Sequence, residues 1–141
     1  MRNSIKTYQT IKVESSINNA DPHTIISMLF EGVFQSISIT KGAIERRDLQ
    51  TKSVQLNKAM SILRSLQDSL DTESEPTISA TFYDLYAYCI DRLIEASVSL
   101  DYTILDQVIN LLKPLATAWK EMPEVNKKEG FALLKSKETA S

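Results

Sequence analysis

The sequence is poor in the residues that build tight turns, disulfides and metal sites. Its 141 residues include three glycines, four prolines, one cysteine and one histidine. So few turn-forming residues argue against an all-β fold with many tight turns. The single cysteine excludes an internal disulfide, and the single histidine excludes the paired Glu-x-x-His motifs of ferritin-like metal sites. We therefore expect no metal, no cofactor and no enzymatic activity.

Long apolar runs and strong charge are also lacking. No segment approaches the ~20 consecutive apolar residues that span a bilayer, and the first twenty residues lack the apolar core of a signal peptide. The net charge is −2, and the densest basic groups are pairs such as Lys127-Lys128. Nucleic-acid-binding domains instead gather basic residues on one face. These features predict a cytosolic protein that neither binds nucleic acid nor inserts into membranes.

Four segments carry apolar residues at helical spacing. They cover about 22–46, 48–71, 77–99 and 101–122. The first has Asp21 as a candidate N-cap and Pro22 at the first helical position, and the others begin after Asp48, at Pro76 and after Asp101. Because the connections are short, neighbouring helices should be antiparallel. The sequence predicts an all-α protein, an antiparallel four-helix up-down bundle with an N-terminal docking segment.

The chain divides into three parts. Residues 1–20 carry spaced apolar residues in a polar background, typical of a segment that docks onto another surface. Residues 21–122 form the bundle, and residues 123–141 read as a flexible tail. Pro114 lies inside the fourth helix, where it either kinks the helix or breaks it and opens a separate short helix. The sequence leaves both alternatives open.

Three residues with reactive or bulky side chains fit structural roles. Cys89 lies in an apolar stripe and is predicted to fill the core. His23 falls in the first turn of the first helix, where we expect a surface or capping contact. Trp119 is predicted to belong to the core.

The apolar residues exceed what four helices can cover among themselves. The segment from Asp84 to Asp101, "DLYAYCIDRLIEASVSLD", has two apolar stripes and not one. Since large exposed apolar patches on soluble proteins usually bind something, we predict grooves that hold an apolar helix or extended segment of another protein. The alternative is a helical homodimer that uses the same surfaces as a structural or adaptor interface. The predicted groove residues are Ile62, Tyr83, Ala87, Ile90, Ile94, Val98, Tyr102, Ile109, Leu112 and Ala116.

Four stretches together resemble a known family. They are "TYQTIKVESS" at 7–16, "DPHTIISMLFEG" at 21–32, "LYAYCIDRLIEAS" at 85–97 and "AW" at 118–119. Their order and spacing over residues 7–122 are similar to those of the FliS family of flagellin-specific export chaperones. The family usually has a basic residue at the position of Asp91, Asn at that of Ser97 and a glycine-bearing turn at "ESEP", and Pro114 is also unusual.

The resemblance implies a cytosolic chaperone in a bacterium. It would bind the disordered C-terminal segment of flagellin, block premature polymerisation and deliver flagellin to the export gate of the flagellar type III apparatus. A chaperone for a different flagellar or secreted client is an alternative. In the family the N-terminal segment covers part of the groove, so Ile5, Tyr8 and Ile11 are the predicted lid. Glu31 and Arg92 stand in the matching motifs, and we predict a partly buried ion pair between them.

Overall fold

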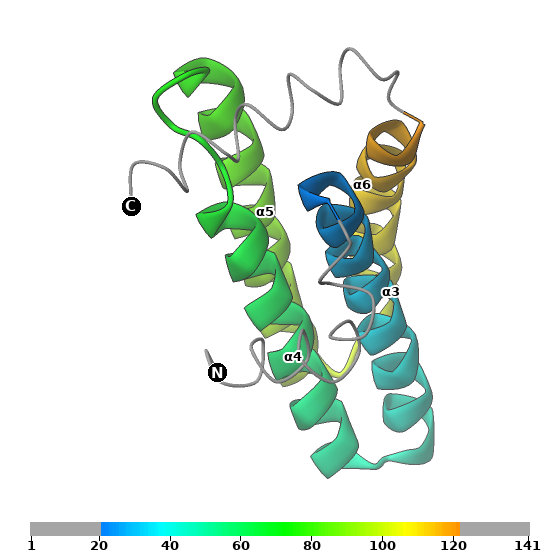
Figure 1. Cartoon of the computed structure of the whole chain (residues 1–141). Coiled ribbons are helices and arrows are strands. Elements are labelled where there is room, and N and C mark those ends of the chain that lie inside the picture. The colour runs from blue at the N-terminus through cyan, green and yellow to red at the C-terminus, as the bar shows by residue number, and fades with distance from the viewer. Residues whose placement is uncertain (1–20, 122–141) are drawn as a thin grey trace.

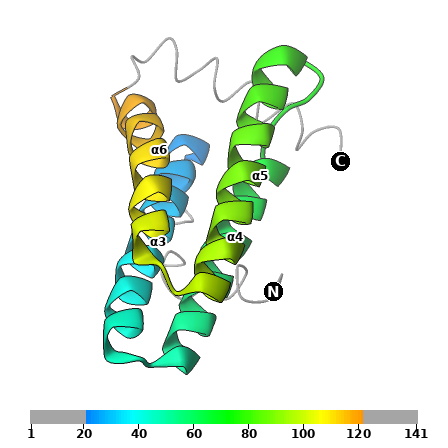
Figure 2. The same cartoon turned by 180° about the vertical axis from the view of Figure 1, so that it is seen from behind.

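The computed structural model describes residues 21–121, which form four α-helices joined by short connections (Figure 1). The helices are α3 (Pro22–Arg46), α4 (Leu49–Asp68), α5 (Pro76–Ser99) and α6 (Tyr102–Lys120). Each packs against two others, in the pairs α3 with α4, α4 with α5, α5 with α6, and α6 with α3. Figures 1 and 2 show that consecutive helices run in opposite directions. This arrangement confirms the predicted antiparallel four-helix bundle.

Polar caps fix where three of the helices begin. Asp21 accepts a hydrogen bond from the backbone N–H of Thr24 at 2.8 Å, and Asp48 accepts one from Thr51 at 3.1 Å. Asp101 caps α6 in the same way through Thr103. Each carboxylate satisfies one of the N–H groups that a first helical turn leaves without an intrahelical partner. The three predicted aspartate caps are confirmed.

The helix ends explain the tight connections. Arg47 and Leu100 end α3 and α5 in the left-handed region, with φ of 60° and 57°. At the first of these ends the N–H groups of Arg47 and Asp48 bond to the carbonyls of Ile44 and Ala43, the Schellman arrangement. Two residues therefore suffice to turn the chain at each of these corners, so the joined helices lie side by side.

The longer connection between α4 and α5 is held by Asp71. Its Oδ1 accepts hydrogen bonds from the backbone N–H groups of Glu73 and Ser74 at 2.9 and 3.2 Å. The hydroxyl of Ser79, in the first turn of α5, donates to the backbone carbonyl of Asp71. The polar break predicted between the second and third helices is thus a hydrogen-bonded loop.

The core lies along the bundle axis. Val33 and Ile37 of α3, Leu63 of α4, Leu93 of α5 and Leu105 of α6 are fully buried. Cys89 is also fully buried, as predicted, and burial raises the pKa of its thiol to about 11. Because the thiolate is the reactive form, this cysteine serves as a core side chain.

The helix α6 continues through Pro114 without a break. The alternative in which Pro114 opens a separate helix is therefore wrong. Proline has no N–H, so the carbonyl of Asn110, four residues earlier, lacks its intrahelical donor. Among the described residues, no helix is long and apolar enough to cross a membrane.

Candidate functional site: an apolar stripe on α5

The stripe predicted on the third helix forms one line along α5. We call it the α5 stripe; it consists of Tyr83, Ala87, Ile90, Ile94 and Val98. Successive members are three or four residues apart, so their side chains share one face of the helix. Tyr83 and Ile94 are each 47% exposed and Val98 is 82% exposed. Ala87 is half-buried, and Ile90 is buried at the inner edge of the line.

The α5 stripe borders α4. Lys52 of α4 donates from Nζ to the backbone carbonyl and the hydroxyl of Ser97, at 3.1 and 3.3 Å. Ser97 lies seven residues after Ile90 and three after Ile94, so all three share one side of α5. At the other end of the stripe, Gln67 of α4 donates to the backbone carbonyl of Tyr83 at 3.1 Å.

Two buried polar side chains thus hold α5 at both ends of the stripe. Lys52 and Gln67 are 8% and 9% exposed. Neither residue was predicted from the sequence, although Lys52 is in helical register with the buried residues Leu56, Ala59 and Leu63. A lysine at a position that is otherwise apolar was the available signal. Its ammonium neutralises the partial negative charge of carbonyls at the C-terminal end of α5.

The predicted residues of α6 lie on a different side of the bundle. Tyr102 is 40% exposed and its ring lies beneath Lys41 of α3, with Nζ 5.8 Å from the ring centroid. Ile109 and Ala116 follow at intervals of seven and so share its face; both are half-buried. These three residues line the contact between α6 and α3, whereas the α5 stripe lies along the contact between α5 and α4. The structure therefore separates the predicted groove residues into two surfaces.

Two predicted groove residues belong to the core. Ile62 and Leu112 are both 0% exposed. Ile62 lies off the main apolar line of α4, but α4 packs against both α3 and α5, so its buried face is wide. Neither side chain lines an exposed surface of residues 21–121.

The predicted ion pair between Glu31 and Arg92 is wrong. Arg92 donates instead to Glu95 of its own helix and, at 2.7 Å, to Gln107 of α6. Glu31 is exposed on α3, which lies across the bundle from α5 and is not one of its two main neighbours. Both residues occur in matching motifs, but the helices that carry them are not adjacent.

The predictions for the lid and for the tail concern residues that the structure does not describe. The lid residues Ile5, Tyr8 and Ile11 and the tail at 123–141 lie outside residues 21–121.

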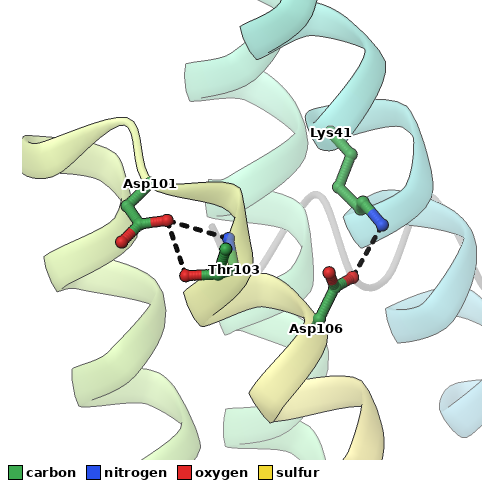
Figure 3. Close-up of polar contacts among 4 residues, drawn as sticks. All are labelled: Lys41, Asp101, Thr103 and Asp106. Atoms are coloured by element: carbon green, nitrogen blue, oxygen red, sulfur yellow. Dashed lines mark hydrogen bonds and ion pairs between the residues drawn. The ribbon is translucent and has the colours of Figure 1, made fainter.

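The contacts at the start of α6 tie this helix to α3 (Figure 3). Nζ of Lys41 lies 2.6 Å from Oδ1 of Asp106, and this hydrogen bond raises the pKa of Lys41. Next to it, Asp101 accepts from the backbone N–H of Thr103 at 3.0 Å and from its hydroxyl at 2.6 Å. These bonds, the hydroxyl first, lower the pKa of Asp101. Lys41 and Asp101 therefore stabilise the fold at the start of α6.

The described residues present an apolar surface that is suited to binding. Within residues 21–121 no three His, Cys, Asp or Glu side chains are grouped so that they could hold a metal ion. The prominent exposed feature is the α5 stripe, held in place by hydrogen bonds from α4. An exposed apolar stripe on an all-α bundle is typical of the class of small helical proteins that bind another polypeptide.

Comparison with known proteins identifies the family. The family model described as "Flagellar protein FliS" matches residues 4–126. The chain therefore belongs to the FliS family, as its sequence motifs indicate. The flagellar secretion chaperone FliSB of Pseudomonas aeruginosa is 33% identical over 116 residues, which are 82% of this chain and 92% of the relative.

Two further relatives carry the name flagellar secretion chaperone FliS. That of Salmonella typhimurium is 34% identical over 119 residues, 84% of this chain and 88% of the relative. That of Vibrio cholerae is 29% identical over 123 residues, 87% of this chain and 90% of the relative. All three relatives are thus named as flagellar secretion chaperones.

Proposed function

We propose that this protein is a bacterial cytosolic export chaperone for flagellin. It binds the disordered C-terminal segment of flagellin along the α5 stripe, keeps flagellin from polymerising and delivers it to the flagellar type III export gate. The observation that carries this proposal is the line of exposed apolar side chains on α5, from Tyr83 to Val98. Membership in the FliS family and the relatives' name, flagellar secretion chaperone, support a role in flagellar secretion; flagellin as the client and the export gate as the destination are parts of the proposal.

The shape of the stripe suits a helical client. Its members recur at the three- and four-residue spacing that a partner helix also presents, so an amphipathic segment lying beside α4 can pack against it. A segment that is disordered when free loses conformational entropy as it folds on the chaperone. Burial of Tyr83, Ile94 and Val98 against the client offsets that loss, because each exposes apolar surface to water beforehand.

Two carboxylates give the stripe an acidic border. Asp84 and Asp91 are exposed and lie seven residues apart on α5, next to the stripe residues Tyr83 and Ile90 in sequence. An arginine or lysine on the bound segment could approach either carboxylate. Charges at the rim of an interface mainly affect association rate and choice of partner. We therefore propose that the client segment carries basic residues beside its apolar anchors.

The N-terminal residues are proposed to regulate access. In this proposal Ile5, Tyr8 and Ile11 cover apolar surface until the client displaces them. A lid of this kind lowers the apparent affinity for the client by holding the site closed. Deletion of residues 1–18 should tighten peptide binding or promote self-association, measured by calorimetry and light scattering. An unchanged affinity together with an unchanged monomer would remove the lid from the proposal.

The central test compares two substitutions at exposed aliphatic residues. Ile94→Asp places a charge in the α5 stripe, and Val54→Asp places one at a 56% exposed site on α4. Isothermal titration with a synthetic flagellin C-terminal peptide should show at least tenfold weaker binding for Ile94→Asp and unchanged binding for Val54→Asp. Circular dichroism should show native helical content for both variants.

The same variants test the homodimer. If the α5 stripe joins two copies of this chain, light scattering will find a wild-type dimer that the peptide does not dissociate, and Ile94→Asp will be monomeric. That result would contradict the chaperone proposal. Equal peptide affinity for wild type and Ile94→Asp would show that the client binds elsewhere.

A further inference from the structure

The two halves of α6 are held in different ways. The fully or nearly fully buried residues of this helix are Ile104, Leu105, Val108 and Leu112. All four precede Pro114. From Lys113 to Lys120 every residue is half-buried or exposed, and the helix has lost one backbone hydrogen bond at the proline. The end of α6 therefore has less support from the core and from its own backbone than the beginning.

A reciprocal clasp joins the end of α6 to the start of α3. Nε2 of His23 lies 2.6 Å from the carbonyl oxygen of Trp119, to which it donates. Nε1 of Trp119 donates to the carbonyl oxygen of His23 at 2.9 Å. The two rings are stacked, with centroids 5.1 Å apart and planes inclined by 14°. Each of these two side chains, 96 positions apart in sequence, thus donates a hydrogen bond to the backbone carbonyl of the other residue.

The clasp also satisfies a helix end. The carbonyl of Trp119 is among the last four of α6, where hydrogen-bond donors are scarce, and His23 adds a side-chain donor to the one that the backbone N–H of Glu121 supplies at the C-cap. His23 lies in the first turn of α3 and is 9% exposed. In Figures 1 and 2 the orange end of α6 lies beside the blue start of α3. The opposite end of the same helix pair is tied by Lys41 and Asp106, whose side chains are 32% and 46% exposed (Figure 3).

We infer that residues 114–120 form a hinged end segment of α6, with Pro114 as the hinge and the His23–Trp119 clasp as its latch. The segment opens from α3 as a unit while the rest of the bundle stays folded. Local opening of this kind occurs where few buried contacts support a segment. Since Leu115, Ala116 and Trp119 pack against the core, opening uncovers apolar surface between α3 and α6, away from the α5 stripe.

Hydrogen exchange of the full-length protein, followed by mass spectrometry, tests the hinge. In the wild type, amides of residues 115–120 should exchange at least tenfold faster than those of residues 104–112. His23→Ala should accelerate the former by a further tenfold or more and leave the latter, α4 and α5 unchanged. The control Lys41→Met removes the other tie between α3 and α6 and should leave residues 115–120 unaffected.

Trp119 supplies a second measurement, because it is the single tryptophan of the chain. Acrylamide should quench its fluorescence several-fold more strongly in His23→Ala than in the wild type, at equal helical content. Trp119→Phe keeps a ring but removes the Nε1 donor. It should also accelerate exchange at residues 115–120, which preserves the test if His23→Ala does not fold.

Three results would overturn the inference. Equal wild-type exchange before and after Pro114 would show that no hinge exists. Unchanged exchange at residues 115–120 in both clasp variants would show that the clasp is no latch. A uniform acceleration across all four helices would show that the clasp contributes to global stability and not to a local opening.

Discussion

Helices α4 and α5 lie against each other, yet α4 is far better covered. Nine of the 20 residues of α4 are buried, against six of the 24 residues of α5. The exposed large apolar residues of α4 are Leu49 and Val54, whereas those of α5 are Ile78, Tyr83, Tyr88, Ile94 and Val98.

The difference shows that apolar content and burial are separate properties in this bundle. Each helix has two main neighbours, but α4 packs most extensively against α3. The buried face of α4 is wide enough to include Ile62, which lies off its main apolar line. The neighbours of α5 cover one side of the helix and leave its second stripe open. An apolar residue therefore indicates a binding surface only where the bundle does not reach it.

The largest effect on stability is expected at Ile62 of α4, compared with the matched residue Ile94 of α5. Ile62→Ala should lower the free energy of unfolding by about 2–5 kcal/mol, because it leaves a cavity at a fully buried site. Ile94→Ala removes the same atoms from a side chain that is 47% exposed and should cost much less. Urea denaturation of both variants measures the difference. Equal losses would mean that the two helices are equally covered.

Lys52 tests how α4 holds α5. Lys52→Ala removes both hydrogen bonds to Ser97, and bonds to charged groups contribute about 1.5–3 kcal/mol. We expect a loss of that size in the free energy of unfolding, measured in urea. Ser97→Ala removes only the bond to the hydroxyl and should cost less. If Lys52→Ala is neutral, the buried ammonium does not stabilise the contact between the helices.

The helix starts differ as well. Asp48 caps α4, whereas Glu75 at the start of α5 makes no side-chain capping bond. Glu75→Asp shortens the side chain to one that reaches the first-turn N–H groups and should stabilise the protein by about 0.5–1 kcal/mol. Thermal unfolding would detect the gain. An unchanged or lower melting temperature would show that the backbone at Glu75 does not permit capping.

A charge reversal on α5 tests the acidic border of the α5 stripe. Exposed charge pairs contribute about 0.2–1 kcal/mol, so Asp91→Lys should weaken binding of a basic flagellin peptide by about two- to fivefold. The effect should shrink as salt is added, because salt screens exposed charges. Titration at low and high ionic strength measures it. Stronger peptide binding by Asp91→Lys would instead indicate an acidic client.

The smallest effect concerns the cap of α4. Hydrogen bonds from the hydroxyl and then the N–H of Thr51 lower the pKa of Asp48. A carboxyl with a lowered folded-state pKa stabilises the fold above its unfolded value, about 3.9, and this stabilisation is lost as the pH falls through the folded value. Any advantage of wild type over Asp48→Asn at pH 7 should thus disappear below about pH 4. Urea denaturation of both proteins across this pH range measures the difference. If wild type remained more stable at the lowest pH, the Asp48 carboxylate would not be its source.

The helix boundaries could be predicted because their signals are local. The first helix was predicted at 22–46 and is Pro22–Arg46, and the third was predicted at 77–99 and is Pro76–Ser99. Proline at a first turn and aspartate at a cap act within three residues of chain, so no tertiary contact is needed to identify them. The core position of Cys89 followed in the same way from its place in an apolar stripe.

The site could be predicted only in part. Helical spacing placed Tyr83, Ile94 and Val98 on one line, and the structure leaves all three exposed. The same spacing could not show that Ile62 and Leu112 are buried, or that the rows on α5 and α6 face different neighbours. The pairing of Glu31 with Arg92, predicted because both stand in the matching motifs, was wrong because their helices lie across the bundle from each other. The clasp between His23 and Trp119 joins residues whose proximity no local pattern records.

The sequence alone determined the class of this protein, its four helices, their starts and the family to which it belongs, because these depend on spacing and on contacts within a few residues. The tertiary structure decided which apolar side chains remain in contact with water and which polar residues hold the helices together. That choice depends on the rotation of each helix about its axis and on the identity of its neighbours, and both are set only when the four helices pack.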